Sequence, residues 1–189
     1  MAIATAAGLL RAGHPRCMDI SVNHAPHIIP VIDRQAFRDG MSRVGAAVHI
    51  ITTAGVAGRA GFTATAVTSV SDDPPTVLVC LNRTGRTASV LTENQVFCVN
   101  TLAAAHQPLA DVFAGRGGLA GEERFGHGEW DSLATGAPAL VGALVAFDCR
   151  VVDFRPVATH QILIGQVEAV RLGPSQPALL YAERAYRQL

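Results

Sequence analysis

Short apolar runs separated by turn residues dominate the chain from residue 46 onward. Runs at 46–53, 76–82 and 96–102 are rich in apolar and β-branched residues, and two longer ones cover 143–154 and 160–172. Runs of this kind, bounded by Gly, Pro, Asn and Asp, are typical of β-strands. The segment 62–70 alternates Thr and Ser with Ala and Val. It follows 46–53 after a Gly-rich loop, so the two predict a hairpin. Many strands and few helices favour an antiparallel barrel over a doubly wound sheet.

Helical periodicity is confined to three segments. Asp33 is suited to cap a helix, and the apolar residues that follow it recur at i, i+4 and i+7: Phe37, Met41 and Val44. This spacing predicts a short helix with one buried stripe, ended by Gly45. Helical patterns also cover 85–93 and 105–116, and residues 117–138 are rich in loop formers.

The first thirty residues lack any sustained period and contain several Gly and Pro. We therefore predict a flexible N-terminal arm over 1–30 and a single domain over 31–189. No apolar run reaches the roughly 18–20 residues that span a bilayer. Four cysteines without C-x-x-C spacing fit a reduced, cytoplasmic protein better than a disulfide scaffold: Cys17, Cys80, Cys98 and Cys149.

The charge balance narrows the class of partner. Fifteen basic and fifteen acidic residues give a formal charge of +0 and are interspersed along the chain. This argues against a nucleic-acid-binding face and against binding to an anionic membrane. The charged fraction of 16% is low for a lone soluble domain, which is compatible with a surface covered by a partner subunit.

Several common functional motifs are absent from the sequence. Gly55, Gly58 and Gly61 form G-x-x-G-x-x-G, which is not the dinucleotide fingerprint, and there is no P-loop or G-x-S-x-G elbow. The seven histidines include no i, i+4 pair, so no metal site is predicted. A nicotinamide cofactor would therefore have to be bound without a Rossmann unit, laid against another cofactor.

The segment 61–82, GFTATAVTSVSDDPPTVLVCLN, is the most informative stretch of the chain. Its small side chains let a planar ligand approach the backbone closely, and its hydroxyls and amides can pair with the edge of a ring or with a phosphate. Taken alone, however, such a stretch is more often a half-exposed strand.

This segment and the blocks around it resemble the short-chain flavin reductase family. The resemblance is carried by FRDGMSRVGAAVHIITT, GRAGFTATAVTSVSDDPPTVLVCLNRTGRT, ENQVFCVNTLAAAHQPLADVFAG, EERF, GALVAFDCRV and THQILIGQVEAV, in this order. Within the family, the sequence is most similar to the RutF-type NADH:FMN reductases of pyrimidine-ring degradation. The resemblance implies a six-stranded antiparallel split barrel with Greek-key order, and a homodimer with one FMN per subunit.

The resemblance also implies site residues. Thr65, Ala66 and Val67 would lie along the isoalloxazine ring of the flavin, and Ser71 and Asn82 would reach the ribityl chain or the ring. The phosphate would meet a guanidinium and a hydroxyl, and the remaining implied residues are a pocket asparagine, a histidine near flavin and nicotinamide, and a tyrosine that closes the pocket: Arg86, Thr87, Asn100, His160 and Tyr186.

Three functions follow from this reading. The leading one is an enzyme that reduces FMN with NADH and supplies the reduced flavin to a flavin-dependent monooxygenase. The second is a flavoprotein that keeps its FMN and reduces another acceptor, such as a corrinoid cobalt or a ferric chelate. The third is a non-enzymatic module that binds flavin or haem. FAD in place of FMN, and NADPH in place of NADH, stay open at this point.

Overall fold

The computed structural model describes residues 32–189. Cys17 and the predicted arm over 1–30 lie outside the described residues, so the domain boundary at residue 30 stays a prediction. Residues Arg34–Leu189 form one compact unit.

Seven antiparallel strands make the main sheet. In spatial order they are β3 (Ala60–Ala64), β2 (His49–Thr53), β6 (Val96–Thr101), β9 (Val145–Val157), β10 (His160–Leu172), β5 (Pro75–Asn82) and β4 (Val67–Asp72). The predicted hairpin is confirmed, since β2 pairs with β3 from His49↔Ala64 to Thr53↔Ala60. The predicted mainly antiparallel β fold is confirmed as well.

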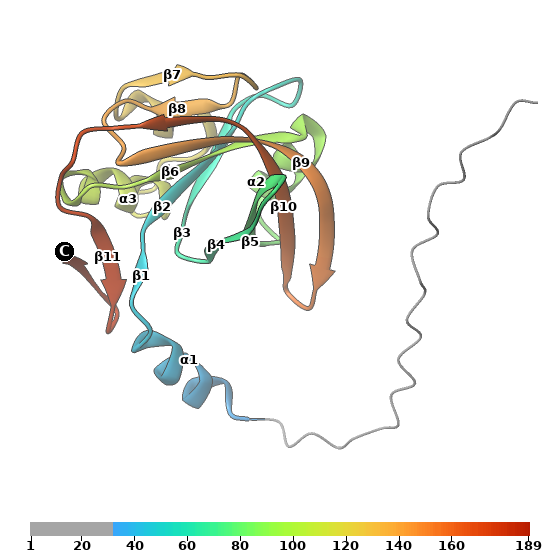
Figure 1. Cartoon of the computed structure of the whole chain (residues 1–189). Coiled ribbons are helices and arrows are strands. Elements are labelled where there is room, and N and C mark those ends of the chain that lie inside the picture. Colours follow the sequence, from blue (N-terminus) through green and yellow to red (C-terminus); the bar gives the residue numbers. More distant parts are fainter. Residues whose placement is uncertain (1–31) are drawn as a thin grey trace, which may run out of the picture. The chain divides into compact units, whose positions relative to one another are not determined.

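The two edge strands of this sheet are consecutive in the chain. β3 and β4 lie at opposite edges, yet only Thr65 and Ala66 separate them. The carbonyl of Ala66 accepts a hydrogen bond from the amide of Cys80 on β5 (3.0 Å), so the chain leaves one edge and joins the other at once. The sheet must therefore curl until its edges meet, as the curved strands in Figure 1 show. The main sheet has seven strands, where six were expected, because the run predicted as one strand over 62–70 is divided at Thr65–Ala66.

Two small sheets complete the β structure. One has the order β1 (Ala46–Ala47), β11 (Leu179–Ala182), β12 (Ala185–Gln188), and the other pairs β7 (Trp130–Ser132) with β8 (Pro138–Leu140). The sequence analysis placed no strand over β7, β8, β11 or β12, whereas β1 falls within the strand predicted over 46–53. The strands have two to four residues each, which is too short for a period to be detected.

Helices cover the barrel at two places. α2 (Arg86–Asn94) buries Ala88 and Leu91 against the barrel interior. η1 (Ala104–His106) leads into α3 (Gln107–Phe113), which packs with η2 (Gly121–Gly126) in a second cluster. There the rings of Phe113, Phe125 and Trp130 contact one another with centroids 5.2–5.4 Å apart. The two helices predicted near 85–93 and 105–116 are thus present.

The first helix corrects one prediction. α1 (Arg34–Ser42) forms where it was expected, but it buries no residue. The predicted apolar stripe, which runs from α1 to Val44 just after it, is exposed instead: Phe37 by 63%, Met41 by 52% and Val44 by 57%. A helical period identifies an apolar face but not what covers that face. α1 is held at its C-terminal end, where Ser42 accepts the amide of Glu183 and Asp39 pairs with Arg184.

The cysteines behave as small apolar side chains. Cys98 and Cys149 are buried and free, and Cys80 is half-buried. Burial raises the pKa of both buried thiols, which keeps them protonated and unreactive at neutral pH. Across residues 32–189, no helix is long and apolar enough to cross a membrane.

Candidate functional site

The end of β3 forms a wall shared by three cavities. The His160 cavity (about 280 Å³) is lined by Phe62, Thr63, Ala64, Thr65, Ala66, Cys80, Leu81, Asn82 and His160. The tyrosine cavity (about 220 Å³) is lined by Val48, Thr63, Ala64, Thr65, Ala114, Arg116, Tyr181 and Tyr186. The α1 cavity (about 590 Å³) is lined by Phe37, Arg38, Met41, Ser42, Val44, Ala46, Thr65, Ala66, Tyr181 and Arg184. Thr65 is common to all three, so the predicted segment lies at the centre of the site.

The break between β3 and β4 leaves backbone donors for a ligand. The carbonyl of Thr65 accepts the amide of Val67 (3.1 Å), and that of Ala66 accepts the amide of Cys80. The amide N–H groups of Thr65 and Ala66 themselves donate no hydrogen bond within residues 32–189. Since both residues line the His160 cavity, two adjacent N–H donors are available there to carbonyl or ring-nitrogen acceptors.

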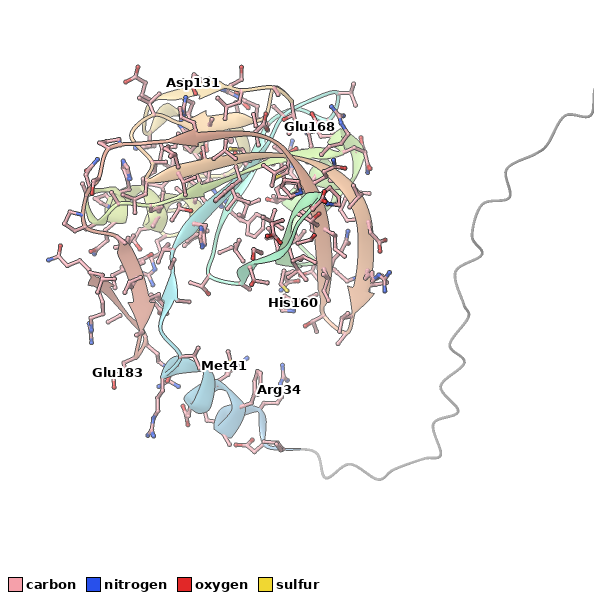
Figure 2. The ribbon with its side chains drawn as sticks, in the orientation of Figure 1. Arg34, Met41, Asp131, His160, Glu168 and Glu183 are labelled. Atoms are coloured by element: carbon pink, nitrogen blue, oxygen red, sulfur yellow. The ribbon has the colours of Figure 1, made fainter. Side chains whose placement is uncertain are left out.

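Strand register brings Asn82 and His160 to the same place. The last residue of β5 is paired with the first of β10, as Asn82↔His160. Oδ1 of Asn82 accepts the amide (3.0 Å) and the hydroxyl (2.9 Å) of Thr84, so the side-chain NH₂ group has no partner among the described residues. Nδ1 of His160 lies 2.9 Å from Oγ1 of Thr159, which leaves Nε2 for a ligand. Figure 2 shows His160 at the end of the barrel nearest α1, the helix that carries Arg34 and Met41.

The two residues predicted to meet a phosphate open α2. Arg86 and Thr87 are its first two residues, and Gly85 precedes them without any side-chain cap. The N–H groups of this helix end therefore lack a capping side chain. Arg86 and Thr87 line none of the three cavities. In sequence, only three residues separate them from Asn82, which does line the His160 cavity.

Tyr186 lies beside the predicted segment. From β12 it lines the tyrosine cavity together with Thr65. Its hydroxyl donates to Oδ1 of Asp111 (3.0 Å), and its ring meets that of Tyr181 edge-on with centroids 5.4 Å apart. Burial and the Asp111 carboxylate raise the pKa of Tyr186 to about 12, so its phenol stays a donor at neutral pH.

Besides Arg86 and Thr87, three more predicted residues line none of the three cavities, and Asn100 is the clearest correction. Asn100 is 0% exposed, its NH₂ group donates to the Ile50 carbonyl (3.0 Å), and its Oδ1 accepts the Leu140 amide (2.7 Å). Its amide is thus used inside the core. Ser71 bonds the backbone of Asp73, and Val67 packs against the barrel core.

The sequence analysis missed Arg116 and Tyr181, which line the tyrosine cavity. Arg116 sits among glycines in the segment AGRGG, and this was the available signal. No group of three or more His, Cys, Asp or Glu side chains that could hold a metal occurs within residues 32–189.

Comparison with known proteins identifies the family of this chain. The sequence model of the family described as "Flavin reductase like domain" matches residues 41–189. The FMN reductase (NADH) RutF of Ancylobacter novellus is 52% identical over 157 residues, which cover 83% of this chain and 86% of that protein. BorF, the flavin reductase component of a bacterial two-component tryptophan halogenase, has a TM-score of 0.77 and 31% identity, with 83% of this chain and 98% of BorF covered. The styrene monooxygenase flavin reductase of Pseudomonas putida S12 has a TM-score of 0.72 and 26% identity, with coverages of 81% and 96%. The chain therefore belongs to the flavin reductase-like family.

Proposed function

We propose that this chain is an NADH-dependent FMN reductase that supplies reduced flavin to a separate monooxygenase. The observation that carries the proposal is the pair of unpaired amides at Thr65 and Ala66, at the centre of three adjoining cavities in a chain of the flavin reductase-like family. The choice of FMN and NADH is supported by the name of the RutF relative at 52% identity.

The residues present fit a flavin. The two amides suit the carbonyl and nitrogen acceptors at the pyrimidine edge of the ring, and the NH₂ group of Asn82 suits a further oxygen acceptor. Arg86 and Thr87 suit a phosphate, because a guanidinium, a hydroxyl and an uncapped helix end all donate to anions. Asn100 is omitted from the proposed site because its amide is already bonded in the core.

The chemistry belongs to the cofactors, and the protein supplies geometry. When both are bound, hydride passes from the nicotinamide to the flavin, and this requires no acid or base from the chain. Donors at Thr65 and Ala66 would stabilise the negative charge that the ring gains on reduction. We assign His160 the role of orienting the nicotinamide or its phosphates, since its imidazole is exposed and lies opposite Asn82.

A second copy of the chain is the proposed occupant of the α1 face. Phe37 and Met41 of α1 and Val44 just after it are more than half exposed, and the α1 cavity that they line is also lined by Thr65 and Ala66. A homodimer that covers this face would remove the stripe from water and would close one side of the site at the same time.

The proposed recipient of reduced flavin is a monooxygenase, and the likeness to RutF points to one of pyrimidine-ring degradation. The support comes from similar proteins, which include the flavin reductases of a two-component halogenase and of a styrene monooxygenase.

Anaerobic stopped-flow oxidation of NADH, with and without excess free FMN, tests the proposal. We expect many turnovers of NADH that scale with added FMN. A single bleaching of bound flavin that ignores added FMN would point instead to a tight flavoprotein with another acceptor. Absence of NADH oxidation would contradict a reductase.

A further inference from the structure

A Gly-rich loop brings an arginine to the edge of the site. After α3 the chain runs through Gly115, Arg116, Gly117 and Gly118, and all three glycines have positive φ (83°, 88° and 79°). A Cβ on Gly117 or Gly118 would meet nothing within 4 Å, so the backbone beside Arg116 is open to a ligand. Arg116 itself lines the tyrosine cavity.

The guanidinium of Arg116 is oriented on one side and open on the other. Nη1 donates to Oδ1 of Asp111 (2.7 Å), and the same oxygen accepts the hydroxyl of Tyr186. The guanidinium also lies over the ring of Tyr186, 5.8 Å from its centroid. The other side-chain N–H groups of Arg116 have no partner among the described residues, and its side chain is 60% exposed. An arginine held in this way loses little freedom when it binds an anion.

The surroundings of the loop favour an anionic ligand. Arg124 donates to three carbonyls, those of Leu119, Gly61 and Phe113, and has no carboxylate partner within residues 32–189. A Cβ on Gly115 would lie 3.5 Å from Nη2 of Arg124, so this unpaired charge is close to the loop. Arg116 is paired with Asp111, whereas Arg124 has no carboxylate partner within residues 32–189, and the neighbouring carboxylate of Glu123 accepts the amide of Ala120 instead.

The position of the cavity indicates which ligand this is. The tyrosine cavity shares Thr63, Ala64 and Thr65 with the His160 cavity, so a ligand in one borders a ligand in the other. At about 220 Å³ it is smaller than the roughly 300–1,000 Å³ of a site that encloses a whole cofactor, and it therefore suits part of one. The flavin phosphate is already assigned to Arg86 in the proposed function, and Nη1 of Arg86 lies 3.8 Å from the position of a Cβ on Gly121.

We propose that Arg116 binds a phosphoryl group of the nicotinamide dinucleotide, in a subsite formed by the tyrosine cavity and the Gly115–Gly118 loop. This inference rests on the proposed function. Asp111 and Tyr186 are positioning residues that fix the guanidinium, and Arg124 adds positive charge beneath the loop. The remaining N–H groups of Arg116 donate to the phosphoryl oxygens.

Binding and kinetics of Arg116→Ala test this subsite. NAD⁺ is titrated calorimetrically into FMN-saturated protein, FMN affinity is measured by fluorescence quenching, and NADH oxidation gives KM and kcat. We expect the NAD⁺ Kd and the NADH KM to rise about tenfold, the effect of losing one charge-assisted hydrogen bond, with kcat and the FMN Kd unchanged. Arg116→Lys keeps the positive charge but loses the planar guanidinium. Its NAD⁺ Kd and NADH KM should therefore lie between those of the wild type and those of Arg116→Ala.

Arg150→Ala is the matched control. Arg150 is also an exposed arginine paired with one carboxylate, Glu168, and it lines none of the three cavities. Figure 2 shows Glu168 at the far end of the barrel from His160. Arg150→Ala should therefore leave the NAD⁺ Kd unchanged.

Each result has a distinct meaning. Unchanged NAD⁺ binding in Arg116→Ala, while the wild type binds NAD⁺ and oxidises NADH, overturns the subsite and leaves the reductase intact. A rise in the FMN Kd alone would assign the guanidinium to the flavin phosphate and would likewise overturn it. A wild type that neither binds NAD⁺ nor oxidises NADH would contradict the proposed function itself.

Discussion

A buried histidine lies directly behind the wall of the site. His49 on β2 is paired with Ala64 on β3, is 9% exposed, and has Nδ1 3.0 Å from Oγ1 of Thr101. Burial lowers the pKa of His49 to about 4, because an imidazolium would lose its hydration there. In the unfolded chain the pKa of histidine is about 6.5, so between these values only the unfolded state takes up the proton.

Stability should therefore fall as the pH drops from about 6.5 to about 4. At pH 5, His49 is expected to reduce the free energy of unfolding by about 2 kcal/mol relative to pH 7. Urea titrations at both pH values check this. His49→Gln should lose that share of the pH dependence, and His160→Gln, at an exposed imidazole, should keep it. Equal pH dependence in the His49 variant and the wild type would contradict the prediction.

At the residue scale, the sequence predicted best those positions whose role depends on neighbours in the chain. Thr65 and Ala66 combine small side chains with a local break in the strand, and both features depend on residues within the segment 61–82. Asn100 carries the same amide as Asn82, but the register of its strand buries that amide in the core, where both its polar atoms are hydrogen-bonded. Asn100 faces Ile50 across β2 and the Leu140 amide from β8, which are far away in sequence. Arg116 was missed for the same reason, since Tyr186 and Thr65 approach it only in the fold.

At the element scale, β10 depends on a glycine where it crosses the barrel. Gly165 lies at a register shift between β10 and β9. A Cβ at this position would lie 2.3 Å and 2.4 Å from ring atoms of Phe97, which is fully buried. The strand can pass this close to the ring only without a side chain.

Gly165→Ala should therefore lower the free energy of unfolding by about 1–3 kcal/mol, the usual cost of overpacking a core. Gly126→Ala is the control, since a Cβ there meets nothing within 4 Å and Gly126 has no positive φ. It should stay within about 0.5 kcal/mol of the wild type. Urea denaturation of the three proteins makes the comparison, and equal stability of Gly165→Ala and the wild type would refute the packing argument.

Elements with a clear period were predicted from the sequence, and elements defined by pairing were not. β9 and β10 are long enough to be recognised, and α2 and α3 show a helical stripe. β11 pairs with β1 on one side and with β12 on the other, and this pairing brings Tyr181 and Tyr186 to the site. The division of β3 from β4 is likewise a consequence of closure, because each half pairs with a different strand.

At the scale of the whole molecule, α1 is the element that the single chain leaves without a partner. The stripe of α1 and the turn after it has the i, i+4, i+7 spacing of a core-facing helix, but Phe37, Met41 and Val44 are more than half exposed. The α1 cavity extends from this stripe to Thr65 and Ala66, so whatever covers α1 also borders the proposed flavin site. Assembly and flavin reduction should therefore be lost together if a second copy is the cover.

Met41→Glu should convert a dimer into a monomer, because a carboxylate in an apolar interface must be desolvated without a partner. Light scattering after size exclusion measures the mass, and circular dichroism checks that the chain stays folded. Gln35→Glu introduces the same charge on the other side of α1, where Gln35 bonds Asp39, and it should remain dimeric. The FMN KM should rise only in Met41→Glu, since only that variant uncovers the Thr65–Ala66 side of the site. A wild type that is monomeric at high concentration would refute the dimer. A monomeric Met41→Glu protein with unchanged FMN KM would separate assembly from the site.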